Sequence, residues 1–337
     1  MMGFDIAKHF QQLLEGKDNL KSTGQAAIET LMQCIEISKA KTVNELTDEL
    51  RNAIVAMSTT DHSIPSIRSA SELFLRLDLM NGYFGQSYKI FSLKSFPNRN
   101  NDNLFISLAT PEENVQEFSI LMNKYKERGN IFIERVKLSK TLIAGFARPF
   151  IQNNMRILTH SYSKVVLEVL LHAKRNGVNA HIFVTESRPD ESGAIMINAL
   201  KNAGIQCTLI MDAEIGYLME TINLVMVGAE GVMETGGIIN KIGTNPMAVC
   251  AKAIHKPFFV MAESIKFVKE YPLNQNDIPI EFKYTASTLK KHEIDGDFSS
   301  EYPLVDYTPP QYINLLFTNL GILTPAAVGD ELLKLYV

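Results

Sequence analysis

One glycine-rich stretch, residues 224–250, places a carboxylate, an amide and a cation close together in the sequence. The carboxylate of Glu230 follows a short apolar run, residues 224–227, which has the length and β-branched content of a buried strand. The amide and the cation belong to Asn240 and Lys241, which come after glycines that let the backbone approach a ligand closely. These residue types suit the binding of a small polar molecule. The same composition would also suit a glycine-rich connection that holds no ligand.

A helix is predicted to begin near the end of this stretch. Asn245 is a suitable N-cap, and Pro246 is favourable at the first helical position. A helix N-terminus presents free N–H groups and a partial positive charge, and Lys241 lies just before it in the sequence. We therefore expect an anion at this point, most simply a phosphate.

Polar side chains also follow the other strands predicted in the second half of the chain. The predicted strands are residues 155–159, 180–185, 207–211, 224–227 and 258–262. Because helix-like runs separate them, they should form a parallel sheet whose carboxyl ends share one edge, where α/β proteins bind ligands. Arg188 and Lys241 would supply positive charge at that edge. Asp212 and Glu230 would supply carboxylates, which completes a set suited to a sugar phosphate.

The first half of the chain has apolar residues at helical spacing and no strand pattern. The predicted helices are residues 4–14, 24–38, 43–57, 66–79 and 111–148. Thr42 and Glu45 have the spacing of a capping box before the third of them. We predict an α/β fold class, with a helical domain over residues 1–148 followed by a Rossmann-like, doubly wound, mainly parallel sheet domain over residues 149–337. The polar stretches predicted as connections are residues 95–103 and 271–304.

Composition and motifs argue against several classes of protein. The net charge of -4 is unlike that of a dedicated nucleic-acid-binding protein. The sequence has no apolar run as long as a membrane span and no signal-peptide core, so we expect a cytoplasmic protein without membrane contact. The 3 cysteines lack the spacing of zinc sites, so we predict no metal. No G-x-G-x-x-G or G-x-x-x-x-G-K-[ST] motif is present, which argues against a nicotinamide cofactor and a P-loop nucleotide hydrolase.

His160 and Ser161 are adjacent at the end of the first predicted strand, and such a pair can indicate nucleophilic catalysis. Adjacent residues on a strand point to opposite faces, however. We therefore do not expect the imidazole to activate the hydroxyl.

Three runs of residues carry a family resemblance. They are THSYSKVVLEVL at 159–170, VTESRPDESG at 184–193 and GAEGVMETGGIINKIGTNPMAVCAKA at 228–253. These runs resemble the alpha regulatory subunits of the eukaryotic translation initiation factor two B complex. The resemblance covers nearly the whole chain and is densest from about residue 150 onward. It implies a regulatory subunit, not an enzyme, of a guanine nucleotide exchange factor that controls translation initiation under stress.

That family is similar to the sugar-phosphate isomerases that act on methylthioribose 1-phosphate and ribose 1,5-bisphosphate. Those enzymes place a cysteine in a T-H-C motif and an aspartate in a G-A-D motif, at the positions of Ser161 and Glu230. A serine is a weaker nucleophile and acid than a cysteine at neutral pH, and a glutamate moves the carboxylate by about a methylene. The resemblance implies a retained anion pocket without catalysis. The alternative is an active aldose–ketose isomerase.

The resemblance also implies roles for residues outside these two positions. Arg188, Asn240 and Lys241 match the sugar-phosphate-binding pattern of the family. Arg68, near the start of a predicted helix, and Asp212, at the end of a predicted strand, are further candidates for binding an anion or sugar phosphate from their positions alone. No cofactor is implied other than a possible sugar-phosphate ligand. A third reading is a metabolite-sensing subunit whose dimer is stabilised by a sugar phosphate.

The implied partners are proteins. The family resemblance points to a homodimer formed through residues 149–337 that joins the beta and delta subunits and the rest of the exchange complex. It also points to the phosphorylated alpha subunit of initiation factor two. That contact is expected around Thr42 and Glu45, with Tyr307 nearby.

Overall fold

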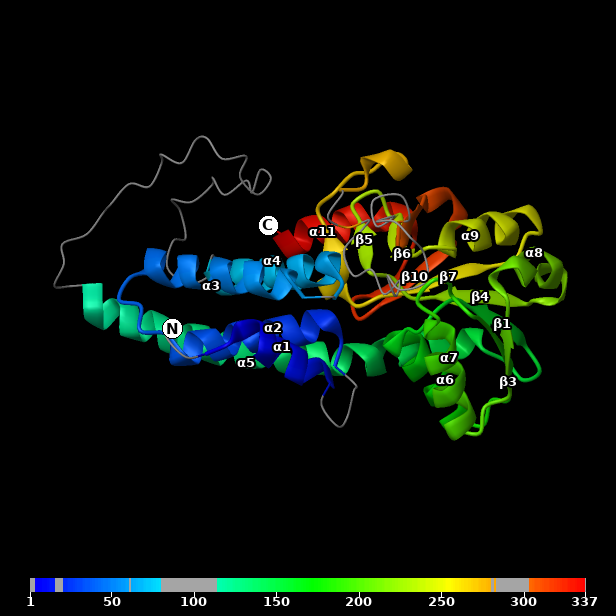
Figure 1. Ribbon diagram of the computed structural model, residues 1–337, viewed down its shortest axis with the longest axis horizontal. Helices are drawn as coiled ribbons and strands as arrows, with labels where there is room; N and C mark the ends of the chain where they lie inside the picture. The colour runs from blue at the N-terminus through cyan, green and yellow to red at the C-terminus, as the bar shows by residue number, and fades with distance from the viewer. Residues whose placement is uncertain are drawn as a thin grey trace, which may run out of the picture.

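The computed structural model describes residues 4–15, 21–60, 62–79, 114–279, 282 and 303–336. The stretch 95–103 and most of the stretch 271–304 lie outside the described residues. The described chain forms a bundle of helices that lies beside an α/β region with two sheets (Figure 1).

Five helices make up the N-terminal bundle, and all of them were predicted. Their bounds are Ile6–Glu15 (α1), Thr23–Ile37 (α2), Val43–Ser58 (α3), Ile64–Leu79 (α4) and Asn114–Ala147 (α5). Side chains at the centre of their shared core include Phe10, Leu31, Leu50, Phe74 and Val136. The capping box is confirmed, because the Thr42 hydroxyl accepts the N–H of Glu45 at 3.2 Å and the Glu45 carboxylate accepts the N–H of Lys41 at 2.7 Å.

The larger sheet of the α/β region has seven strands. Their bounds are Arg156–Thr159 (β1), His181–Thr185 (β2), Cys207–Ile210 (β3), Leu224–Val227 (β4), Phe258–Met261 (β7), Leu315–Thr318 (β10) and Gly321–Leu323 (β11). The order is β11-β10-β7-β4-β1-β2-β3, and every neighbouring pair is parallel except β10 and β11. Chain order reverses direction between β1 and β4, which makes this pair the topological switch point of a doubly wound sheet.

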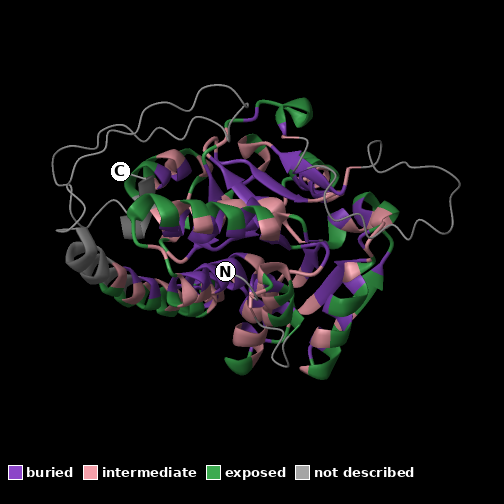
Figure 2. Ribbon diagram, turned by 60° about the vertical axis from the view of Figure 1, so that its left-hand side comes forward, coloured by how far each residue is buried: buried purple, intermediate pink, exposed green. Residues whose placement is uncertain are grey.

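Helices cover both faces of this sheet. They are Lys164–Arg175 (α6), Ser192–Asn202 (α7), Ile215–Leu218 (α8), Thr244–Ala253 (α9) and Val328–Tyr336 (α11). One face packs against α6, α7 and the last turns of α5, and the other packs against α8, α9 and α11. Figure 2 shows the strands buried between helices whose outer surfaces are exposed. The predicted Rossmann-like fold class is confirmed.

The glycine-rich stretch is not a plain connection. It forms a hairpin of Gly231–Met233 (β5) and Ile238–Lys241 (β6), which joins Phe267–Val268 (β8) and Val305–Thr308 (β9) in a second sheet with the order β8-β5-β6-β9. The turn of the hairpin depends on Gly236, which has φ 81 and where a Cβ would lie 2.1 Å from the Pro325 carbonyl oxygen. The glycines hid a strand pattern whose apolar side chains, such as Val232 and Ile238, are fully buried.

The start of α9 also differs from the prediction. The N-cap is Gly243, with φ 104, and Asn245 lies inside the first turn. A Cβ at position 243 would lie 2.9 Å from the His160 ring. Only glycine combines the left-handed backbone with this close contact. The predicted N-cap at Asn245 is therefore wrong.

Candidate anion-binding crevice at the sheet edge

The carboxyl ends of β1 and β4 face the N-termini of two helices of the bundle. The two strand ends approach closely, since a Cβ on Gly228 would lie 2.4 Å from the Ser163 hydroxyl oxygen. Ser22, the N-cap of α2, donates to the Glu263 carboxylate at 3.5 Å. In the first turn of α4, Ser66 donates to the Glu230 carbonyl at 2.9 Å. The sheet edge at the switch point, which is where doubly wound folds place the ligand crevice, is therefore bounded by two positive helix ends.

Three lysines from separate elements gather beside this crevice. Lys140 comes from α5, Lys164 is the first residue of α6, and Lys266 follows β7. The Lys164 ammonium donates to the Lys21 carbonyl at 2.7 Å, and the Lys266 ammonium donates to the Ala229 carbonyl at 2.6 Å. Backbone carbonyls thus accept hydrogen bonds from two of the three ammonium groups.

The buried carboxylate of Glu263 offsets part of this charge. Its side chain is fully buried, and its Oε2 atom has no hydrogen-bond partner among the described residues. The pKa of Lys164 is lowered to about 8, and burial is the largest cause. The nearby charges of Lys140 and Lys266 also lower this pKa, and Glu263 raises it. Glu263 and, beside Lys266, the carboxylate of Glu230 therefore act as counter-charges to these lysines.

Sequence reasoning missed these lysines because they come from segments far apart in the chain. One signal was available at Lys164. It stands at the first position of α6, where a lysine faces the positive end of the helix dipole. A cation at such a position is unfavourable for the helix dipole, so it indicates a nearby anion or ligand.

Glu230 is ionised at the top of the crevice. Burial favours its neutral form, but Lys266 and Lys241 lie close and the hydroxyls of Ser63 and Ser66 donate to it, so its pKa is lowered. The distance from the Ser66 hydroxyl to Oε2 is 3.4 Å. A carboxylate in this state is a poor general acid, because a general acid must hold a proton.

Ser161 is held by a chain of polar groups that ends at Lys241. Its backbone is left-handed, with φ 63, and its hydroxyl lies 2.6 Å from that of Ser192. The Ser192 hydroxyl donates to Asp190 at 2.8 Å, and Asp190 pairs with the Lys241 ammonium at 3.1 Å. Burial opposes the charge of Asp190, but the lysine and the hydrogen bonds outweigh it and lower its pKa. Lys241 therefore has an internal counter-ion that sequence reasoning did not find.

His160 does not activate Ser161. Its Nε2 atom lies 2.8 Å from the Ile242 carbonyl, which can only accept, so Nε2 carries the proton. Its Nδ1 atom lies 2.6 Å from the Thr185 hydroxyl. Burial lowers the pKa of His160 and keeps the ring neutral. The ring thus connects the ends of β1 and β2 to the turn before α9.

Arg188 and Asp212 shape a loop beside the crevice. The Arg188 side chain is 61% exposed and pairs with Glu186 and Glu191. The Asp212 carboxylate accepts the N–H groups of Ser187 at 3.0 Å and Arg188 at 2.8 Å. The Asp212 side chain therefore stabilises the loop by accepting hydrogen bonds from the loop backbone.

Arg188 and Lys241 are brought together as predicted, but in a very small cavity. The residues lining this cavity are Ser187, Arg188, Pro189, Asp190, Lys241, Ile242 and Leu304. Its volume of about 10 Å³ has room for roughly one water molecule. A sugar phosphate does not fit there without movement of the loop.

The N-terminus of α9 already holds an anion. The Oδ2 atom of Asp306 accepts the N–H of Gly243 at 2.8 Å and the N–H of Asn245 at 3.0 Å. Asn240 also serves this turn, because its amide donates to the Thr244 hydroxyl at 3.0 Å. Asp306 thus accepts two of the N–H groups at the helix end where the sequence predicted a ligand anion, and that anion stays a prediction.

The remaining predicted residues are Arg68, Thr42, Glu45 and Tyr307. The Arg68 guanidinium lies over the Phe282 ring, 5.9 Å from its centroid, beside the second sheet. Thr42 and Glu45 are exposed at the α2–α3 turn (Figure 1). Because the start of α2 touches the crevice and α2 has 15 residues, this turn lies roughly 22 Å away.

Tyr307 does not lie beside that turn. It is on β9, is 1% exposed and places its hydroxyl 2.9 Å from that of Thr235. The structure therefore does not bring Tyr307 together with Thr42 and Glu45 within one chain.

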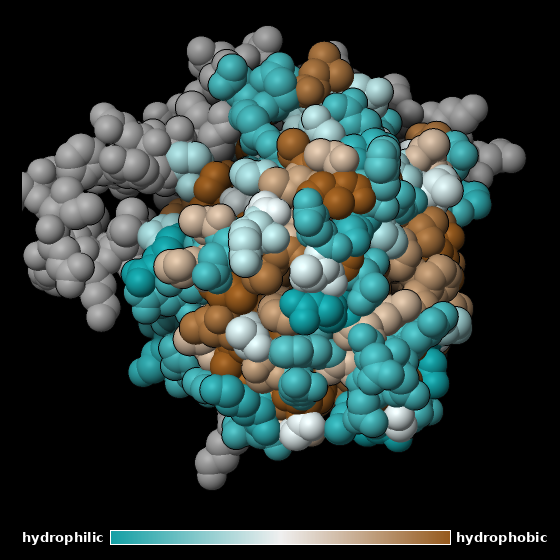
Figure 3. All heavy atoms as spheres, turned by 90° about the vertical axis from the view of Figure 1, so that its right-hand side faces the viewer, coloured by the Kyte–Doolittle hydropathy of each residue, from teal (hydrophilic) through white to brown (hydrophobic). Residues whose placement is uncertain are grey.

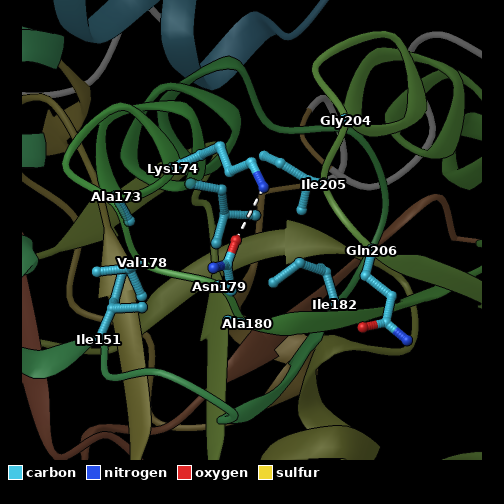
Figure 4. A pocket seen from close by; sticks show the side chains of 11 residues that line it. Ile151, Ala173, Lys174, Val178, Asn179, Ala180, Ile182, Gly204, Ile205 and Gln206 are labelled. Carbon is cyan, nitrogen blue, oxygen red and sulfur yellow. Dashed lines mark hydrogen bonds between the residues drawn. The ribbon is translucent and has the colours of Figure 1, made fainter.

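A larger cavity, of about 200 Å³, lies at the opposite edge of the large sheet. Aliphatic side chains such as Ile151, Val178 and Ile182 line it, and Lys174 donates to Asn179 at 2.9 Å across it (Figure 4). It lacks the converging charged groups of the crevice, so we do not assign it a site.

Among the described residues, no group of three or more His, Cys, Asp or Glu side chains could hold a metal ion. None of the helices in this part of the chain is long and apolar enough to span a membrane.

A doubly wound, mainly parallel sheet with helices on both faces, joined to a helical bundle, defines a Rossmann-like α/β fold. The chain belongs to the Initiation factor 2 subunit family, which it matches over residues 18–325. It is 44% identical over 338 residues to the translation initiation factor eIF2B subunit alpha of Caenorhabditis elegans, with 100% of both chains covered.

More distant relatives include an enzyme. The ribose 1,5-bisphosphate isomerase of Archaeoglobus fulgidus is 31% identical over 198 residues, which cover 59% of this chain and 63% of that one. A chain of the tetrameric eIF2B-beta2-delta2 complex from C. thermophilum has the same fold, with a TM-score of 0.69 and 18% identity. That match covers 98% of this chain and 94% of the other.

Proposed function

We propose that the chain is a regulatory subunit of the guanine nucleotide exchange factor for translation initiation factor two, in the role of the alpha subunit, in the cytoplasm. The observation that carries this proposal is the 44% identity over the whole of both chains to a protein named eIF2B subunit alpha. Identity at that level over the bundle as well as the crevice supports conservation of the whole architecture and not of a ligand site alone.

Co-purification tests this proposal. The tagged chain, expressed in eukaryotic cells, should co-purify with beta- and delta-type subunits of the exchange factor. Recovery of the chain without any of these subunits would contradict the assignment.

The second candidate function is an active sugar-phosphate isomerase, which the match to the archaeal isomerase favours. The crevice argues against it. Ser161 has no base beside it, since its hydroxyl bonds to Ser192 and the neighbouring His160 is bonded elsewhere. Glu230 has a lowered pKa and is ionised. We expect no ketose product from ribose 1,5-bisphosphate or methylthioribose 1-phosphate, and turnover at enzyme-like rates would overturn the non-catalytic assignment.

The crevice is proposed to bind a sugar phosphate as a regulatory ligand. Its support is the match to a ribose 1,5-bisphosphate isomerase and the three lysines that gather beside the N-terminus of α2. A hexose phosphate should raise the melting temperature of the protein. Lys164→Gln should remove this shift, whereas the matched control Lys201→Gln, at an exposed site on α7, should keep it. Equal shifts in the two variants would contradict the site.

The chain is also proposed to form a homodimer through its α/β region. Apolar side chains are exposed at the end that carries β3 and α8, namely Leu209 at 47%, Met211 at 56% and Tyr217 at 86%. Figure 3 shows apolar residues among polar ones on this end of the molecule. Sedimentation should detect a dimer at micromolar concentration that Tyr217→Lys weakens. A monomer under these conditions, or a dimer unaffected by the substitution, would exclude this interface.

The helical bundle is proposed to contact the phosphorylated alpha subunit of initiation factor two near Thr42 and Glu45. Both residues are exposed, which permits contact. Within the assembled complex, Glu45→Lys should reduce capture of the phosphorylated protein relative to the unphosphorylated one. Equal capture of both forms by the unaltered complex would remove the sensing role.

A further inference from the structure

The long helix α5 carries a stripe of exposed apolar side chains on its solvent-facing side. Ile131, Leu138, Leu142 and Phe146 are 48%, 58%, 47% and 38% exposed. Successive members are separated by seven, four and four residues, which places all of them on one side of an α-helix. The stripe is therefore an apolar surface that the described part of the chain leaves exposed.

The arrangement on α5 differs from scattered surface apolar residues, which are normal in soluble proteins. Helix α3 shows the ordinary case. Its exposed apolar side chains, Val43 and Val55, stand twelve residues apart and form no stripe. A continuous apolar stripe with near-heptad spacing is instead the pattern by which one helix packs against another.

Gly145 lies within the same stripe, three residues after Leu142. A Cβ at this position would meet no atom within 4 Å, so no packing within the described chain requires a glycine here. A glycine inside a helix costs about 1 kcal/mol of stability relative to alanine. A glycine beside Phe146 does, however, leave room for another helix to approach α5 closely.

The apolar surface continues onto the free edge of the large sheet. The edge strand β11 contacts α5 and pairs with β10. Ile322 of β11 is 40% exposed and lies opposite Phe317, which packs against the last turns of α5. Because residues paired across two strands point to the same face of a sheet, Ile322 lies on the α5 side. The exposed surface thus extends from the helix to the sheet edge.

The spacing of the stripe is the same when it is followed from either end. Arg135 occupies the position between Ile131 and Leu138. The midpoint of positions 131 and 146 and the midpoint of positions 135 and 142 both fall between residues 138 and 139. A two-fold axis at this point would pair Ile131 with Phe146 and Arg135 with Leu142 of an antiparallel second copy. Leu138 of the two copies would meet at the axis.

The charges on α5 favour this antiparallel arrangement. A parallel pair would place Arg135 against Arg135, and like charges repel. The antiparallel pair places its aliphatic stem on Leu142 and its guanidinium near the Phe146 ring. Beside the stripe, Glu134 and Lys137 form an ion pair at 2.6 Å, so this flank carries no net charge that would repel a second copy.

We propose that α5 is an interface between two copies of this chain, in which the stripe of one copy packs antiparallel against the stripe of the other. This surface is separate from the β3–α8 end, and the proposal does not depend on a dimer there (Figure 1). A helix pair of roughly 22 Å buries less than the approximately 800 Å² per partner of a standard interface. We therefore expect association at concentrations on the order of 10–100 µM. Both interfaces together would join two dimers into a tetramer.

Disulfide cross-linking tests the position of the two-fold axis. The partly exposed Cys207 and Cys250 are first replaced by serine. In this background Leu138→Cys should form an intermolecular disulfide under a mild oxidant, because the axis brings the two copies of residue 138 together. Val55→Cys, at an exposed site on α3, is the matched control. Cross-linking of Leu138→Cys that does not exceed that of Val55→Cys would overturn the proposal.

The same assay tests the antiparallel direction. Ile131→Cys and Phe146→Cys should each remain unlinked alone, because each site lies far from its own copy. A mixture of the two variants should form a disulfide between them. Cross-linking of Ile131→Cys with itself would indicate a parallel pair and would contradict the proposed arrangement.

Sedimentation measures the association without a cross-link. All variants carry Tyr217→Lys, which removes the other proposed interface, so failure of the dimer at the β3–α8 end does not affect the result. In this background Leu138→Lys should weaken self-association by about tenfold or more, because it places two ammonium groups at the axis. Val55→Lys should leave self-association unchanged. If Leu138→Lys also leaves it unchanged, the proposal is wrong.

Two other occupants of the stripe would give different results. If Leu138→Lys lowers the melting temperature of the monomer, residues of the same chain cover the stripe. If Leu138→Lys leaves self-association intact but prevents co-purification of the beta- and delta-type subunits, the stripe binds those subunits. Either result would overturn the pairing of two copies through α5.

Discussion

The helix N-termini of α2 and α9 are the same structural element in opposite electrostatic states. The N-terminus of α2 has a serine N-cap that donates to Glu263, and Lys140, Lys164 and Lys266 gather beside it. The N-terminus of α9 has a glycine N-cap, an internal carboxylate from Asp306 and a neighbouring lysine that is already paired. The charged groups that meet a helix end therefore come from other segments of the chain, and the helix itself does not determine them.

The largest effect that would sharpen this comparison is expected from Asp306→Asn. The folded-state pKa of Asp306 is raised from 3.8 to about 7, so the folded protein binds more protons than the unfolded chain between these values. Stability should fall as pH rises through this window and stay low above it. Asp306→Asn should remove the fall and add roughly 3 kcal/mol to the free energy of unfolding at pH 8. Urea unfolding from pH 5 to pH 8 measures this, with Asp277→Asn as control. If Asp306→Asn leaves the pH dependence of the free energy of unfolding unchanged, the Asp306 carboxylate is not a buried charge.

The α2 end should respond to pH in its ligand affinity. Lys164 has a pKa lowered from 10.5 to about 8, so it loses its charge in the folded protein as pH rises past that value. Affinity for a hexose phosphate should fall by about tenfold between pH 7 and pH 9.5, the loss of one charge-assisted contact. In Lys164→Arg the fall should be smaller, because arginine keeps its charge. Calorimetric titration measures the affinity of both proteins at each pH. If the affinity of the two proteins falls equally with pH, Lys164 does not contact the ligand.

The fold was largely predictable from the sequence, and the charges of the crevice were not. The predicted strands at 224–227 and 258–262 match β4 and β7 because buried parallel strands are short apolar runs. The hairpin β5–β6 was missed because its glycines break that pattern. Lys140 and Lys266 meet only through tertiary packing, which no local spacing records.

The predicted site residues show the same division. Asn240 and Lys241 lie just before a helix, as the sequence placed them, but on strand β6, which it did not predict. Their partners, Asp306 and Asp190, come from other segments and had no local signal. A motif therefore predicts where polar groups lie, but not whether another part of the chain already satisfies them.

A smaller effect is expected at the junction between the sheet edge and α4. Glu230 has a lowered pKa, so it contributes stability above its unfolded value of 4.5 that is lost as pH falls through the folded value. Glu230→Gln should lower the free energy of unfolding by about 1 kcal/mol at pH 7 and by less at pH 3. Glu234→Gln, in the same hairpin region, is the control. If the two variants unfold alike at every pH, Glu230 does not hold this junction.

The smallest effect is expected at the distal end of the bundle, where no ligand contact is proposed. Thr42→Ala removes the N-cap of α3 and should lower stability by about 1 kcal/mol or less, without changing hexose phosphate affinity. Thr47→Ala serves as the control, because Thr47 donates only to the Val43 carbonyl within the same helix. If Thr42→Ala changes the affinity for hexose phosphate, the distal end of the bundle is coupled to the crevice, and the prediction that the two are independent is wrong.

The most direct test of the central claim is a crystal structure of the protein with a bound hexose phosphate. The account predicts phosphate density at the N-terminus of α2, within hydrogen-bonding distance of Lys164 or Lys266, and an unchanged Asp306 at the N-terminus of α9. Phosphate density at the N-terminus of α9, beside Lys241 and with Asp306 displaced, would contradict it.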